Sequence, residues 1–339
     1  MPLTKPVSKI IMLSNHPLPR RILFALGLAA SLATLTACDR RSGPVTEDAS
    51  DISSTDKPAL ASEDARRDRP AGPPRPAMWK LSDADTTIYL FGGVHMLPQG
   101  LDWQTGMVDK AAREADMLIL ELAPEEQAKA SAVLAEIAAD TPQPPLEQRI
   151  PPQFTDDLDL LAARTQLSRP QLDDMESWAA ALVLSNAVSR NSALSLERGT
   201  EKQLTKAFEA MGKPVTGLET VEYQLGLFDA LPQRTQDALL ARTISDAPNA
   251  AGKFDKLVAA WARGDVVAVG LYADSELRAV DGLAGPLLTT RNRQWAEWLR
   301  DRMQLPGTIL VSVGAGHLVG DDSVQAMLAQ EGYKVERVQ

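Results

Sequence analysis

The sequence predicts an α/β (α+β) fold in which the N- and C-terminal segments of the folded region form a mixed central sheet, with a large helical insertion between them. Short apolar runs typical of strands occur near both ends, within 78–122 and 308–338. The stretch between them has mostly helical spacing and is broken by prolines. The folded region, 78–339, is about 260 residues long, which is enough for one sizeable core.

The N-terminal end of this region predicts two paired strands, a helix and a third strand. Residues 78–81 and 86–91 flank an Asp-rich turn and predict a hairpin. The run 116–122 is short and apolar, which predicts a buried strand. Between them a helix is expected with Asp102 as its N-cap and an apolar stripe made of Trp103, Met107, Val108, Ala111 and Ala112.

Beyond residue 122 the pattern is mainly helical until the chain returns to strand. The expected order is helix over 124 to about 212, a strand at 213–218 ended by Glu219, a helix from about Val221, more helix over roughly 233–304, a strand at 308–313, a helix at 321–331 and a strand at 333–338. Strands at both ends around a helical middle favour one sheet with an insertion.

The first 37 residues have the features of a lipoprotein signal peptide. Two arginines precede a weakly polar to apolar run at 22–33, which is too short to predict a membrane-spanning helix. Leu35-Thr36-Ala37-Cys38 resembles a bacterial lipobox, which implies cleavage before Cys38 and acylation of that cysteine. The alternative is an ordinary signal peptide or an uncleaved anchor. We therefore expect a lipid-anchored protein of the cell envelope, at the inner or the outer membrane.

Residues 38–77 predict a disordered tether, because they are rich in Asp, Ser, Pro, Arg and Ala and almost free of large apolar side chains. The leader contains four of the 35 basic residues and no acidic ones, so the mature chain has 31 basic and 45 acidic residues, a net charge of −14. This balance argues against nucleic acid as a partner. The single cysteine excludes an internal disulfide and a cysteine-based metal cluster.

His95 and His317, the two histidines outside the leader, occur in matching turns. Gly92-Gly93-Val94-His95 and Gly314-Ala315-Gly316-His317 each follow an apolar strand. Glycine lets the backbone turn sharply where a strand ends, and ligands of α/β sheets gather beyond the carboxyl ends of strands. Imidazole suits both proton transfer and metal coordination, so the pair predicts one functional site. The alternative is that each is a hydrogen-bonded core histidine.

Four further polar residues are candidates for the same site. Glu121 lies near the end of an apolar strand, where it is either a functional carboxylate or simply exposed at the strand tip. Glu219 ends another expected strand. Arg291 and Asn292 fall on or beside the apolar face of the helix that begins near Pro286. An inward arginine needs a carboxylate or a ligand, so the alternative for Arg291 is a structural ion pair with Glu121 or Glu219.

Taken together, these residues resemble the TraB/GumN family, which is similar to the TIKI proteases and more distantly to the ChaN and erythromycin-esterase group. The matching segments run in order through nearly the whole folded region: Trp79-Lys80, 88–95, 118–121, Met175-Glu176-Ser177-Trp178, Gly199-Thr200-Glu201, 213–220, Arg291-Asn292, 314–320 and Gly332-Tyr333. Two positions depart from the family pattern. Gly93 stands where Thr or Ser is usual, which removes a hydroxyl from the turn, and Glu201 stands where Asp is commoner.

The resemblance implies a catalytic site made of His95, Glu121, Arg291 and His317, with Glu219 and Asn292 as further candidates. In a metal-dependent hydrolase of TIKI type, His95, Glu121 and His317 would hold a divalent cation that activates water for attack on an amide or ester. Arg291 would stabilise developing negative charge or hold a substrate carboxylate. The substrate would be a peptide or a related small molecule.

Two other functions remain open. The first is a module that binds a peptide, haem or another ligand without turning it over, as pheromone-inhibitor relatives in the family are thought to do. The second is a structural envelope protein whose histidines serve only packing. Loss of a ligand from the histidine variants would favour the first, and silent variants would favour the second.

Overall fold

A computed structural model describes residues 72–139, 141–165, 167–190 and 194–339. The expected signal peptide, Cys38 and most of the expected tether lie outside these residues. Within them, none of the helices has the length and apolar character needed to cross a membrane.

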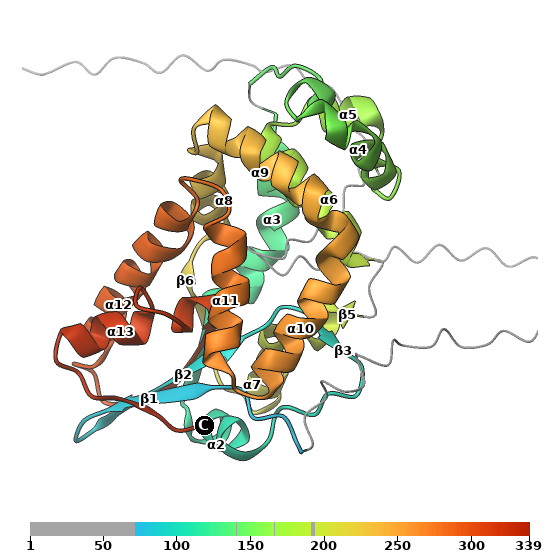
Figure 1. The fold of residues 1–339 in the computed structure, drawn as a ribbon. Helices are drawn as coiled ribbons and strands as arrows, with labels where there is room; N and C mark the ends of the chain where they lie inside the picture. The colour runs from blue at the N-terminus through green and yellow to red at the C-terminus, as the bar shows by residue number, and fades with distance from the viewer. Residues whose placement is uncertain (1–71, 140, 166, 191–193) are drawn as a thin grey trace, which may run out of the picture.

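The centre of the fold is a six-stranded sheet with the order β6-β4-β7-β2-β1-β8. β2, β7, β4 and β6 are mutually parallel, whereas β1 runs antiparallel to both β2 and β8. Figure 1 labels β1, β2 and β6 of this sheet and the helices around it. The strands are β1 (Met78–Ser82), β2 (Thr86–Gly93), β4 (Met117–Leu122), β6 (Val215–Glu219), β7 (Gly307–Gly314) and β8 (Val335–Arg337). The expected hairpin and the mixed sheet built from both ends of the chain are confirmed.

The register of the parallel strands brings both Gly-x-x-His turns to the same level. β2 and β7 pair from Thr86 with Gly307 to Gly93 with Gly314, so the two strands leave the sheet side by side. On the other side of β7, Leu122 of β4 pairs with Glu219 of β6. The carboxyl ends of four parallel strands therefore share one edge of the sheet, which is where ligand sites of α/β folds lie.

Helices fill the sequence between β4 and β7. They are α3 (Pro124–Ile137), α4 (Thr155–Ala162), α5 (Arg169–Asp173), α6 (Ser177–Arg190), α7 (Thr200–Ala210), α8 (Val221–Asp229), α9 (Gln233–Asp246), α10 (Ala250–Ala262), α11 (Val266–Leu277), a π-helical turn (Gly285–Thr289) and α12 (Thr290–Arg302). α2 (Gly106–Glu114) precedes β4, and α13 (Val324–Gln330) follows β7. A small second sheet pairs β3 (Leu97–Pro98) with β5 (Leu194–Ser195).

Successive residues of the central strands pack into cores on opposite faces of the sheet. Phe91 packs with Trp103 and Trp261 beneath α2, α7 and α10, whereas Leu90 packs with Trp295 of α12 on the other face. Both faces are covered by helices, so the strands are apolar on both sides instead of alternating with polar residues.

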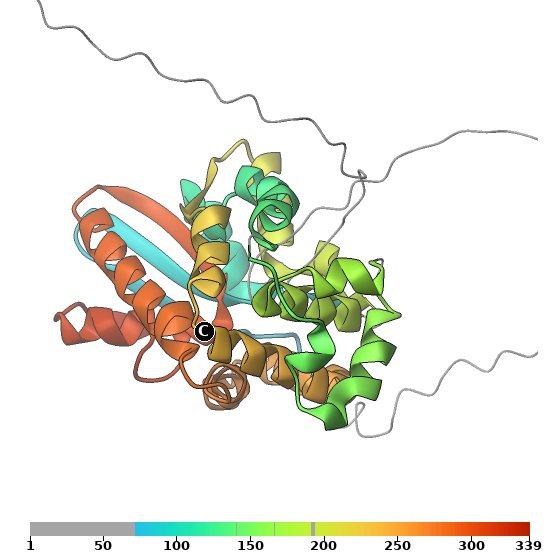
Figure 2. The same ribbon diagram turned by 90° about the horizontal axis from the view of Figure 1, so that it is seen from above.

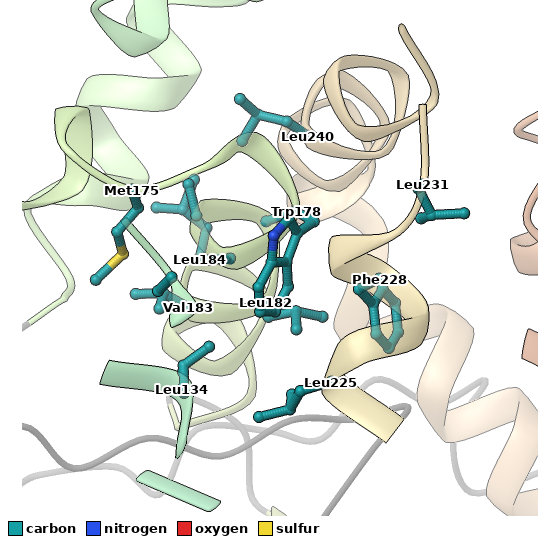
Figure 3. Close-up of a cluster of buried hydrophobic side chains, with 14 of the residues drawn as sticks. Leu134, Met175, Trp178, Leu182, Val183, Leu184, Leu225, Phe228, Leu231 and Leu240 are labelled. Atoms are coloured by element: carbon teal, nitrogen blue, oxygen red, sulfur yellow. The ribbon is translucent and has the colours of Figure 1, made fainter. Parts of the chain in front are cut away.

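A third core holds the helical insertion together. Viewed from above, the green helices of residues 150–190 lie to one side of the blue and red strands (Figure 2). Their core is centred on Trp178 of α6, whose ring stacks on Phe228 of α8 at 6.3 Å between centroids (Figure 3). The insertion thus has its own apolar core beside the sheet.

The expected start of α2 is wrong. The helix begins at Gly106, its N-cap position is Thr105, and Asp102 caps nothing. Gly106 has a φ of +57°, a left-handed conformation that interrupts the helix before it can reach Trp103. Trp103 lies outside the helix and stacks on Phe91, which explains its apolar position in the pattern.

Candidate active site

The carboxyl edge of the sheet gathers the site residues expected from the sequence. Glu121 is the penultimate residue of β4, and Glu219 is the last residue of β6. His95 and His317 lie just beyond the ends of β2 and β7. Arg291 reaches them from the first turn of α12. Segments that are more than 200 residues apart in sequence thus meet at one edge.

Arg291 is the centre of a buried network. Its Nη2 donates to Glu121 Oε2 at 2.6 Å and to Glu219 Oε2 at 2.8 Å, and its Nε donates to Glu219 Oε1 at 3.0 Å. Nη1 donates to the carbonyl oxygen of Leu287 and lies 3.2 Å from His317 Nε2. The ion pair anticipated for Arg291 is therefore present with both carboxylates, and it joins them to His317.

The hydrogen bonds of His317 fix its tautomer. Its Nδ1 lies 2.5 Å from Asn292 Oδ1, and Asn292 Nδ2 donates to the carbonyl oxygen of Asp322 at 2.7 Å. Asn292 therefore presents an acceptor, so Nδ1 carries the proton and Nε2 accepts from Arg291. Burial and the neighbouring Arg291 charge lower the pKa of His317 to about 3, so the ring is neutral at physiological pH.

Glu121 is held as a carboxylate. It is buried, so the alternative that it is exposed at the strand tip is wrong. Its Oε1 accepts from the backbone N–H of Gly314 at 2.7 Å and lies 4.0 Å from His317 Nε2. Burial is the largest single effect and would raise the pKa of Glu121, but the Arg291 charge, together with smaller contributions from the two histidines and the Gly314 N–H, lowers it to about 2.

Two further side chains besides Arg291 donate hydrogen bonds to Glu219. Trp295 Nε1 donates to its Oε1 at 2.9 Å, and Gln224 Nε2 donates to its Oε2 at 2.8 Å. The guanidinium of Arg291 also lies over the Trp295 ring, 4.7 Å from its centroid. These contacts hold Glu219 and Arg291 in one arrangement.

His95 belongs to a second part of the site, with Glu201 as its partner. His95 Nδ1 lies 3.3 Å from Glu201 Oε1, and Glu201 is in the first turn of α7. Burial is the largest single effect and would lower the pKa of His95, but the charge and hydrogen bonding of Glu201, together with the Glu121 charge, raise it to about 9. At neutral pH His95 is therefore an imidazolium. Its side chain is 18% exposed, more than that of Glu121, Arg291 or His317.

The start of α7 is hydrogen-bonded to the His95 turn. The backbone N–H of Thr200 donates to the carbonyl oxygen of Val94 at 3.0 Å, and Thr200 Oγ1 accepts from the N–H of Val94 at 2.9 Å. A Cβ on Gly199 would overlap the carbonyl oxygen of His95, so this glycine allows the two segments to touch. This contact positions Glu201 next to His95.

Sequence reasoning did not identify Glu201, Thr200 or Ser312 as site residues. Ser312 lies in β7 beside the Gly93 turn, and its buried hydroxyl has no hydrogen-bond partner in the described part of the chain. Glu201 stood inside a segment that resembles the family, but an acidic residue in the first turn of a helix is also common for electrostatic reasons alone. No local signal therefore separated it from a surface residue.

The side chains do not fit the expected divalent cation. Among the described residues, no group of three or more His, Cys, Asp and Glu side chains is arranged to hold a metal ion. His317 Nε2 faces a guanidinium, and His95 is an imidazolium whose Nδ1 faces Glu201. Coordination requires neutral imidazole. Metal binding by His95, Glu121 and His317 stays a prediction.

Comparison with known proteins confirms the family resemblance. The sequence model of the TraB/PrgY/gumN family matches residues 77–337. The uncharacterized protein YbaP of Escherichia coli strain K12 is 26% identical over 246 residues, which cover 71% of this chain and 87% of YbaP. YbaP of Shigella flexneri is 26% identical over 245 residues, with the same coverage. No solved structure matches the chain significantly.

Proposed function

Because the chain belongs to the TraB/PrgY/gumN family, we propose that it is a hydrolase of amide or ester bonds in peptide-like substrates, with His95 as the substrate-facing acid. The observation that carries this proposal is the His95–Glu201 pair at the carboxyl edge of the sheet. A carboxylate that orients an imidazole through Nδ1 leaves Nε2 for the reacting group, as in other hydrolytic sites.

The raised pKa of His95 suits an acid better than a base. With a pKa of about 9, the ring is protonated at neutral pH and can donate a proton to a leaving nitrogen or oxygen. The attacking water then loses one proton to the ring, so His95 returns to its starting state. Water adds across the bond, and the products are a carboxylic acid and an amine or alcohol.

The network around Arg291 would supply a fixed electrostatic environment. Glu121 and Glu219 place two negative charges beside the single positive charge of Arg291, and the charge of Glu201 offsets that of His95. The excess of one negative charge favours a substrate that carries a cationic group, such as a peptide amino terminus or a basic side chain. The buried hydrogen bonds hold this environment rigid before a substrate arrives.

The proposal is tested with a peptide library incubated with the mature protein and analysed by mass spectrometry for new termini. Wild type should generate them, and His95→Gln should be slower by about 100-fold or more, the usual contribution of a positioned acid. Arg113→Met, which removes an exposed charge on α2, is the control and should cleave as wild type. A folded His95→Gln protein with full activity would overturn the assignment of His95.

A ligand-binding protein without turnover is the second candidate. It is favoured by the hydrogen bonds that Glu121, Glu219, Arg291 and His317 make with one another. Side chains that already bond to each other are more typical of a rigid scaffold than of groups that react with a substrate. In the same library experiment, a binding protein would deplete intact peptides and produce no new termini. Depletion that disappears in His95→Gln would then assign His95 to binding.

Tethering through an acylated Cys38 completes the proposal. Its support is the lipobox-like Leu35-Thr36-Ala37-Cys38 after a short apolar run. Cells grown with an alkyne-bearing fatty acid should label the wild-type protein and leave Cys38→Ser unlabelled. A wild-type protein that stays unlabelled and keeps residues 1–37 would contradict the anchor.

A further inference from the structure

A cleft of about 420 Å³ opens in the helical insertion, away from the histidine site. It is bordered by α9, by the 3₁₀ turn Pro152–Phe154 and by the segment before the π-helical turn. Its walls are largely apolar and include Phe154, Ala241 and Val280. Three charged side chains also line it: Arg149, Asp237 and Arg242. Its volume falls within the range of small-molecule sites.

Arg149 is a buried cation in the wall of this cleft. It is 7% exposed. Its Nη1 donates to the carbonyl oxygen of Met175 at 2.7 Å and to Ser177 Oγ at 3.3 Å, and its Nη2 donates to the carbonyl oxygen of Asp173 at 2.8 Å. Nε has no partner among the described residues. The guanidinium is thus held rigidly by neutral oxygens.

The charge of Arg149 lacks a direct counterion. No carboxylate of the described chain lies within 4.0 Å of its nitrogens, and burial lowers its pKa. Asp237, Asp173 and Glu176 act on its charge from a greater distance, and Asp237 is linked to it through Ser177, whose hydroxyl donates to Asp237 Oδ1 at 2.6 Å. A buried cation with only neutral partners is costly unless an anion pairs with it.

The other charged side chains of the cleft do not provide an anion that pairs with Arg149. Arg242 of α9 pairs with Asp246 at 2.6 Å. Asp237 is occupied by Ser177 and by Gln233 Nε2 at 2.9 Å. Because Asp246 offsets Arg242 and neutral donors occupy Asp237, Arg149 is the lining cation that no carboxylate of the described residues contacts, although the whole protein is acidic. That combination selects an anion with an apolar body.

We propose that the Arg149 cleft is a second binding site, separate from the histidine site, for a small organic anion that has an apolar body. The anionic group, a carboxylate or a sulfonate, would lie toward Arg149, and the hydrocarbon or aromatic part would contact Phe154, Ala241 and Val280. No lining residue of the cleft belongs to the histidine site. Binding here is therefore independent of hydrolysis.

The test uses the fluorescent anion 8-anilinonaphthalene-1-sulfonate as the probe for the mature protein. We expect one saturable site per chain, displaced by octanoate and not by the neutral octanamide. Arg149→Met, which keeps an apolar stem and removes the charge, should weaken the probe at least tenfold. Equal displacement by octanamide, or unchanged affinity in a folded Arg149→Met protein, would overturn the proposal.

A second variant keeps the test decisive if Arg149→Met fails to fold. Ala238 is an exposed residue of α9 at the rim of the cleft, so Ala238→Trp should block entry and leave the contacts of Arg149 in place. Ala135→Trp on an exposed face of α3 is the matched control and should bind as wild type, as should His95→Gln. Full probe binding by Ala238→Trp would contradict the site.

Discussion

The hydroxyl of Thr200 lies where a side chain on Gly93 would have to go. A Cβ at Gly93 would overlap Thr200 Oγ1 and would lie 2.9 Å from Glu201 Oε1. Thr200 Oγ1 accepts a hydrogen bond from Val94, so the turn receives a hydroxyl from α7. The glycine at this position thus leaves space for a residue more than 100 positions away in the sequence.

Gly93→Ser is expected to destabilise the protein by about 1–3 kcal/mol, because the new Cβ overpacks the Thr200 hydroxyl. Gly93→Ser combined with Thr200→Ala should recover part of that loss, since the serine gains space and its hydroxyl lies near Val94. Urea unfolding of wild type, both single variants and the double variant measures the coupling free energy. Strictly additive effects would show that the two positions do not compete for the same space.

Removal of the Arg291 guanidinium is expected to cost about 3–5 kcal/mol, because two buried carboxylates would lose their counterion. Arg291→Met keeps most of the side-chain volume, so the change reports mainly the charge. Arg113→Met, which breaks an exposed pair with Asp109 on α2, is the control and should cost less than about 1 kcal/mol. Equal free energies of unfolding for the two variants would mean that the network adds no stability.

The position of the histidine turns could be predicted because the information is local. A glycine where an apolar strand ends and a histidine three residues later can be recognised in a single stretch, and parallel pairing then brings two such ends together. The inward direction of Arg291 and Asn292 also follows from the apolar stripe of one helix, and both side chains are buried. These features need no knowledge of distant contacts.

The parts that escaped prediction depend on long-range contacts or on one backbone angle. Glu201 meets His95 only because Thr200 bonds to Val94, a pairing across 106 positions that no periodicity reveals. The true start of α2 depends on the left-handed conformation of Gly106. The partner of His95 escaped for a similar reason, because nothing in the spacing of His95 and Glu201 indicates that the two side chains meet.

Chelation is expected to leave the melting temperature unchanged, because Arg291 and Asn292 hold Glu121 and His317 without help from an ion. Thermal melts before and after dialysis against EDTA, with elemental analysis of the purified mature protein, measure this. One equivalent of a divalent metal, lost on chelation together with stability, would contradict the side-chain arrangement and support a metallohydrolase. His95→Ala and His317→Ala would then be expected to lack that metal.

The stability of the protein should depend on pH in opposite ways on the two sides of about pH 6.5. The folded state holds the His317 ring neutral, with a pKa near 3, and Glu121 ionised, with a pKa near 2. Acidification from pH 6.5 first charges histidine in the unfolded chain, and below pH 4.5 it also protonates glutamate there, so the unfolded state binds more protons. The free energy of unfolding should therefore decrease toward acid pH.

On the alkaline side the His95–Glu201 pair determines the outcome. The folded-state pKa of His95 is about 9, above its ordinary value of 6.5, so its contribution is complete below pH 6.5 and is lost as the pH rises through 9. The loss is at most about 3 kcal/mol. Glu201→Gln removes the charge that raises this pKa, so its free energy of unfolding should stay nearly level over the same range. Urea unfolding at pH 6, 7.5 and 9 compares the two proteins, and parallel losses in both would show that Glu201 does not hold the His95 proton.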